Sequence, residues 1–121
     1  MVRSASWMVS LDYRRAIGDY CQHLSAYLVR VETLAENDFL KDLLSTTQAG
    51  NAWIGLTDQE HEGIWKWIDT DIPATFSDWG PGEPNNYQGQ NEECVYFYSF
   101  KDYMWNDGMC HHKAVPLCEK D

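Results

Sequence analysis

The sequence predicts an α+β domain with two helices in its first half and small antiparallel β-sheets with long loops in its second half. Apolar residues recur at spacings of three and four before residue 50, which is typical of amphipathic helices, whereas later they form short β-prone runs. Residues 69–93 are rich in Asp, Pro, Gly and Asn and therefore indicate a long irregular loop. At 121 residues, the chain is expected to form a single domain spanning residues 1–121.

Two helices account for the first half. The first is predicted over residues 13–24, and its apolar face consists of Tyr13, Ile17, Tyr20, Cys21 and Leu24. After a short strand at residues 28–31, the second helix begins at a capping box made by Thr33 and Glu36 and ends before residue 46. Its expected buried stripe consists of Phe39, Leu40, Leu43 and Leu44.

Strands are predicted in the second half where β-prone residues cluster, at residues 53–56, 64–68, 94–100, 103–105 and 114–118. The loop between the second and third of these is too long to be ordered by itself in a compact domain. Disulfides or bound ions are the devices that hold such a loop, so we expect at least one of them here.

The four cysteines are residues 21, 94, 110 and 118. None of them forms the close pairs, separated by two to four residues, that structural zinc sites use. An even number of widely spaced cysteines favours two disulfides and an oxidising, extracellular compartment. The sequence alone allows three pairings.

The charge of the chain limits its partners. It carries 9 basic and 19 acidic side chains, for a formal net charge of −10. Such a surface repels phosphate backbones, which argues against nucleic-acid binding, and it suits a protein that binds hard cations. No apolar run reaches the roughly 18–20 residues of a membrane span, so no membrane insertion is expected. Residues 1–20 contain no secretory signal, so an exported protein is expected to be represented here without its signal peptide.

Oxygen-bearing side chains in the loop half predict a calcium site. Calcium takes six to eight oxygen ligands from carboxylates, amides and backbone carbonyls. Five side chains could supply such ligands: Glu83, Asn85, Glu92, Asn106 and Asp107. A backbone oxygen of Asp107 could be a sixth ligand. A cis bond before Pro84 would turn the side chains on either side of it toward one point.

The mixture of acids and amides also predicts sugar binding. Vicinal sugar hydroxyls at an open calcium position can each donate a proton to a carboxylate and accept one from an amide. In this scheme Glu83 and Glu92 accept, and Asn85 and Asn106 donate. Taken singly, Glu-Pro-Asn at 83–85 and Asn-Asp-Gly at 106–108 are common turn sequences, and only their combination indicates a binding site.

Several motifs resemble those of the C-type lectin domain family. They are Trp-Ile-Gly-Leu at residues 53–56, Phe-Ser-Asp-Trp-Gly-Pro-Gly-Glu-Pro-Asn-Asn at 76–86 and Trp-Asn-Asp at 105–107. The resemblance runs from about Cys21 to Lys120, and it implies the disulfides Cys21–Cys118 and Cys94–Cys110. It further implies that the five oxygen-bearing residues bind the principal calcium ion and the sugar.

The resemblance also maps an auxiliary calcium site onto Asp58, Glu62, Asn86, Glu92 and Glu93. Asn86 stands where an aspartate is usual, and Glu93 is longer than the usual aspartate, so this site departs from the family pattern. Glu-Pro-Asn implies mannose, fucose or N-acetylglucosamine. The loop that carries Tyr87 is one residue longer than in mannose-binding relatives. Galactose-type ligands, which could stack on the ring of Tyr87, therefore remain an alternative.

Glycans outside the cell are therefore the expected partners, and useful avidity would require several copies of the domain to assemble. The main alternative is a C-type lectin-like domain that binds a protein or a mineral without sugar. No catalytic activity is expected, because the four histidines neighbour no plausible nucleophile. The alternation of Trp65 and Trp67 is interpreted as core packing rather than as a stacking groove.

Overall fold

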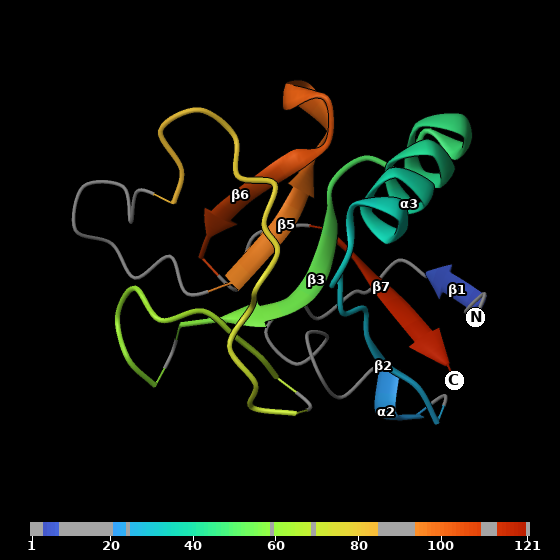
Figure 1. Ribbon diagram of the computed structural model, residues 1–121. Helices are drawn as coiled ribbons and strands as arrows, with labels where there is room; N and C mark the ends of the chain where they lie inside the picture. Colours follow the sequence, from blue (N-terminus) through green and yellow to red (C-terminus); the bar gives the residue numbers. More distant parts are fainter. Residues whose placement is uncertain are drawn as a thin grey trace.

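The computed structural model describes residues 4–7, 21–23, 25–58, 60–68, 70–84, 94–109 and 114–120. In chain order the elements are β1 (Ser4–Trp7), α2 (Cys21–His23), β2 (Tyr27–Leu28), α3 (Leu34–Thr47), β3 (Ala52–Thr57), β4 (Lys66–Trp67), β5 (Cys94–Tyr98), the 3-10 helix η3 (Ser99–Lys101), β6 (Met104–Gly108) and β7 (Val115–Lys120). They form an α+β fold, as predicted, with α3 beside a curved sheet (Figure 1). Across these residues we find no helix with the length and apolar character needed to span a membrane.

The strands form one sheet with the order β1-β7-β3-β5-β6, and β2 also pairs with β7 while β4 pairs with β3. The pairs are antiparallel except β3 and β7, which run parallel where Ala52 faces Val115 and Trp53 faces Pro116. The prediction of purely antiparallel sheets was therefore wrong. Hydrophobic periodicity identifies strands without giving the direction in which they pair.

The second predicted helix is α3, and its capping box is confirmed. The Thr33 side chain accepts a hydrogen bond from the backbone N–H of Glu36 at 3.2 Å. Leu40 and Leu44 are buried as expected, but Phe39 is 52% exposed, so its assignment to the buried stripe was wrong. The buried face of the helix includes Asn37 instead, because a polar network described below satisfies its amide.

The first predicted helix is described only at Cys21–His23, which are helical; the rest of residues 13–24 lies outside the described residues. The strand predicted at 28–31 is β2, limited to Tyr27 and Leu28. Leu28 and Val29 pass so close to β3 that a side chain on Gly55 would lie 2.9 Å from the carbonyl oxygen of Leu28. Glycine is therefore required at the centre of the predicted 53–56 strand.

Two strand boundaries in the hairpin of β5 and β6 also differ from prediction. Strand β5 ends at Tyr98 rather than at residue 100, because Ser99–Lys101 form a 3-10 turn. Strand β6 extends to Gly108 rather than to residue 105, since its ladder with β5 runs from Met104 to Gly108. Asn106 and Asp107 therefore lie in a paired strand and not in a turn.

The largest buried side chains are tryptophans. Trp67 and Trp105 lie with Leu40, Leu44 and Phe97 in the main core. Trp53 lies in a second cluster with Tyr96 and the half-cystines at 21, 94 and 118. Trp67 was correctly interpreted as a core residue, at 2% exposure.

One predicted disulfide is confirmed. Cys21 and Cys118 are bonded, with 5.5 Å between their Cα atoms, and they tie α2 to β7 across a sequence separation of 97. Cys94 is also disulfide-bonded, but its predicted partner, Cys110, lies outside the described residues.

Candidate functional site

The loop over residues 70–84 is fastened to β6 by backbone hydrogen bonds. The N–H of Trp105 donates to the carbonyl of Asp78 at 2.8 Å, and the N–H of Gly80 donates to the carbonyl of Trp105 at 2.9 Å. The N–H of Glu83 donates in turn to the carbonyl of Gly80 at 3.0 Å. This chain of contacts holds the backbone of Glu83 close to the peptide that joins Trp105 to Asn106, although the two segments are more than twenty residues apart in sequence.

The turn that carries Glu83 depends on local sequence. Gly82 has a φ of 79°, in the left-handed region that glycine adopts without a steric penalty. The peptide bond between Glu83 and Pro84 is cis, the geometry considered for this position from the sequence. Glu83 is half-buried, and its Oε1 atom is covered from solvent.

A buried polar network connects the same loop to α3. The indole N–H of Trp105 donates to Oδ1 of Asn37 at 3.0 Å, and Nδ2 of Asn37 donates to Oδ2 of Asp78 at 2.8 Å. Lys41 pairs with the same carboxylate oxygen of Asp78 at 3.0 Å. Asn37 is 1% exposed and Trp105 is fully buried, so this network joins helix, loop and β6 in the interior.

Strand β6 presents the two other described residues of the predicted principal site. Asp107 is 1% exposed, so its carboxylate is removed from solvent. Asn106 is half-buried, and its Nδ2 donates to Oη of Tyr96 at 2.9 Å and to the carbonyl of Asp107 at 3.1 Å. Both N–H groups of the Asn106 amide are thus engaged, whereas the sequence-based scheme assigned one of them to a sugar hydroxyl. Its Oδ1 accepts no hydrogen bond from any described residue.

Asp58, from the predicted auxiliary site, directly follows β3 and is 3% exposed. One carboxylate oxygen accepts from the backbone N–H of Gly63 at 2.9 Å. The other, Oδ1, is buried and has no hydrogen-bond partner within the described part of the chain. Because buried carboxylate oxygens are normally satisfied, this one fits a cation ligand. Glu62, the other described residue of that site, is exposed.

The remaining predicted ligands, Asn85, Asn86, Glu92 and Glu93, and the predicted stacking residue Tyr87 lie outside the described residues. Among the residues that are described, no three His, Cys, Asp or Glu side chains gather as a metal site would require. Of the predicted principal set, the described residues connect only the backbone of Glu83, through Gly80 and Trp105, to the strand that carries Asn106 and Asp107. The side chains of Glu83, Asn106 and Asp107, two acids and an amide, carry the hard oxygen ligands that calcium takes.

The chain matches the family model of the lectin C-type domain over residues 13–120. It belongs to the C-type lectin domain family. It is 36% identical to a hepatic lectin of Gallus gallus over 101 residues, which are 83% of this chain and 46% of that lectin. The chain therefore spans about half the length of this relative. C-type lectin domains are binding domains, so the chain is not an enzyme.

Solved C-type lectin structures agree with the fold. The carbohydrate-recognition domain of the mouse scavenger receptor C-type lectin superposes with a TM-score of 0.82 at 29% identity, covering 100% of this chain and 93% of that one. The domain of cow CD23, solved in the presence of a GlcNAc2Man3 oligosaccharide, gives a TM-score of 0.82 at 30% identity, covering 99% and 88% of the two chains.

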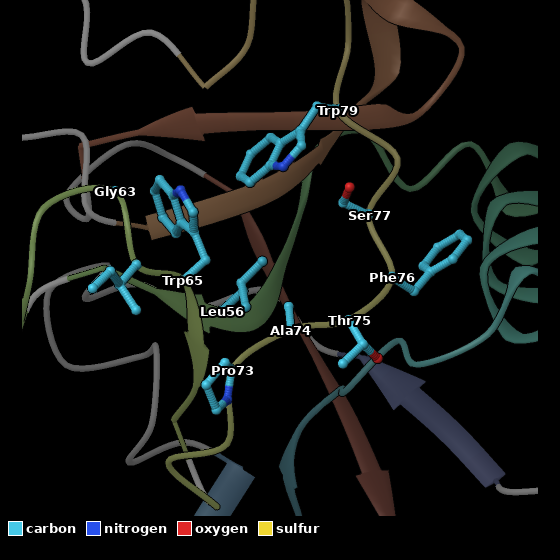
Figure 2. A pocket seen from close by; sticks show the side chains of 10 residues that line it. Leu56, Gly63, Trp65, Pro73, Ala74, Thr75, Phe76, Ser77 and Trp79 are labelled. Atoms are coloured by element: carbon cyan, nitrogen blue, oxygen red, sulfur yellow. The ribbon is translucent and has the colours of Figure 1, made fainter.

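This C-type lectin domain also has a groove of about 320 Å³ on the side of the 70–84 loop, shown in Figure 2. The rings of Trp65 and Trp79 stand together at its wall, with centroids 5.1 Å apart. Trp65 is half-buried and packs against the main core, whereas Trp67 lies wholly inside it. The two tryptophans therefore have different environments: Trp65 lines the groove, and Trp67 lies in the core. Only Trp67 is explained completely by core packing.

Sequence reasoning missed three residues that support the candidate site. Asn37 lies at a polar position of an amphipathic helix, and Asp78 belongs to the motif at 76–86 but was given no contact or role. Tyr96 appeared as one of many β-prone residues in strand β5. Tyr96 could have been identified only from the register of β5 and β6, which places it opposite Asn106. The sequence does not give this register.

Proposed function

We propose that this C-type lectin domain binds sugars through a calcium ion held by Glu83, Asn85, Glu92, Asn106 and Asp107. The observation that carries the proposal is the backbone link from Glu83 through Gly80 and Trp105 to Asn106. It supports a common site for two sequence motifs, each of which would be an ordinary turn by itself. A buried carboxylate at Asp107, and an Oδ1 on Asn106 that accepts no hydrogen bond from the described residues, add ligands of the right chemistry.

Calcium, when bound there, would accept lone pairs from two vicinal sugar hydroxyls. Around it, the carboxylate of Glu83 would accept a hydrogen bond from a sugar hydroxyl, a charge-assisted interaction that offsets the cost of desolvating the sugar. Because the N–H groups of Asn106 already have acceptors, the amide donor for the sugar falls to Asn85 in this proposal.

Mannose, fucose and N-acetylglucosamine are the proposed ligands, because Glu-Pro-Asn at 83–85 is the motif associated with them. The similarity to cow CD23, solved with a GlcNAc2Man3 oligosaccharide present, supports this choice. Oδ1 of Asp58, which is buried and has no hydrogen-bond partner in the described part of the chain, supports a second, auxiliary calcium ion. The disulfide between Cys21 and Cys118 supports an extracellular location.

The test is retention on mannose and galactose resins loaded in calcium and eluted first with EDTA and then with each free sugar. We expect retention on mannose, release by EDTA and release by free mannose. Preference for galactose would keep the calcium mechanism and point to Tyr87. Retention that survives both EDTA and free sugar would favour a protein or mineral partner and overturn the proposal.

A further inference from the structure

The amide of Asn106 has one defined orientation. Its Nδ2 lies 3.1 Å from the carbonyl oxygen of Asp107, and exchanging the amide nitrogen and oxygen would set two acceptors against each other. Nδ2 must therefore face this carbonyl. The same nitrogen lies 2.9 Å from Oη of Tyr96, which accepts the second N–H.

The hydroxyl of Tyr96 is itself held by the core. Tyr96 is 8% exposed and lies directly opposite Asn106 in the ladder of β5 and β6. Its ring packs edge-on against Trp53, with centroids 5.3 Å apart, and against Tyr98 at 5.6 Å. Trp53 is fully buried, so the position of the phenol is set by packing and not by solvent.

We propose that Tyr96 is a positioning residue that fixes the Asn106 amide with its Oδ1 directed to the calcium ion. The inference depends on the proposed function, since it concerns the same site. Two N–H acceptors, Tyr96 and the Asp107 carbonyl, lock the amide plane before the ion arrives. The oxygen ligand is then preorganised, so that less rotational freedom is lost on binding.

The experiment compares Tyr96→Phe with Tyr98→Phe. Each change removes one phenolic hydroxyl, and the rings of Tyr96 and Tyr98 pack against each other. The hydroxyl of Tyr98 makes no hydrogen bond within the described residues, so Tyr98→Phe is the matched control. Calcium affinity is measured by calorimetric titration without sugar. We expect Tyr96→Phe to weaken calcium binding by about two- to tenfold, the equivalent of one neutral hydrogen bond, and Tyr98→Phe to leave it unchanged.

A second readout follows the hydrogen bond itself. The side-chain NH₂ resonances of Asn106 in the calcium-free protein should shift in Tyr96→Phe and not in Tyr98→Phe. Equal calcium affinities in the two variants, or equal weakening in both, would overturn the inference while leaving the lectin function intact. Failure of the wild-type protein to bind calcium would instead overturn the proposed function, and this inference with it.

Discussion

At the scale of single residues, the sequence predicted the motifs of the site but not the buried residues that hold those motifs in place. Glu83, Asn106 and Asp107 have residue types whose chemistry identifies them. Asn37 has no such signature, because an asparagine on a helix is exposed unless buried partners satisfy it. Its role is defined only by its contacts with Trp105 and Asp78, which come from distant parts of the chain.

Asn37→Ala is expected to destabilise the fold. It leaves the buried indole N–H of Trp105 without its acceptor and removes a donor from Asp78, so a loss of about 1–3 kcal/mol in the free energy of unfolding is expected. Urea unfolding measures it. Asp38→Ala, at the next and exposed helix position, is the matched control and should change stability by less than about 0.5 kcal/mol. Equal stability of the two variants would show that the network contributes nothing.

At the scale of elements, periodicity and capping predicted where α3 and β3 lie, because both signals are local. The length of β6 was underestimated because Asn-Asp-Gly is a turn sequence in isolation and becomes a strand only by pairing with β5. The parallel contact of β3 with β7 was missed for a related reason, since pairing direction is a property of the whole chain. The loop over 70–84 was correctly predicted as irregular, but its attachment to β6 was not foreseen.

The two tryptophans near β4 should differ in their contribution to stability. Trp67 is 2% exposed within the main core, so Trp67→Ala is expected to cost about 3–5 kcal/mol. Trp65 is half-buried at the groove wall, so Trp65→Ala should cost clearly less. Denaturant midpoints of the two variants provide the comparison. An equal loss in both would show that Trp65 is a full member of the core and that the groove is not open at its side chain.

At the scale of the whole molecule, one covalent bond joins elements near the two ends of the fold. Replacing both Cys21 and Cys118 by alanine frees a loop with a sequence separation of 97, which is worth about 4–5 kcal/mol in the chain-entropy model. We expect a correspondingly large fall in the unfolding midpoint under oxidising conditions. A variant as stable as the wild type would mean that packing of β7 against β1 and β3 is sufficient to hold the termini.

The acidity of the molecule links calcium to stability. With a formal net charge of −10, and with buried carboxylates at Asp58 and Asp107, a cation that binds only the folded state should raise its stability. Calcium at a hundred times its dissociation constant should add about 2.7 kcal/mol. Thermal unfolding in calcium and in EDTA measures this, with magnesium as the control ion. Identical melting in calcium and EDTA would count against both calcium sites.

The central claim is calcium-dependent sugar binding at Asn106. Its most direct test is a calorimetric titration of methyl α-mannoside and methyl β-galactoside into the wild-type protein and into Asn106→Ala, each in calcium and in EDTA. We predict saturable binding of the mannoside to the wild type in calcium, and no binding to the wild type in EDTA or to the variant, whose circular dichroism should remain that of the wild type. Sugar binding that persists in EDTA or in Asn106→Ala, or no binding of either sugar to the wild type in calcium, would contradict the claim.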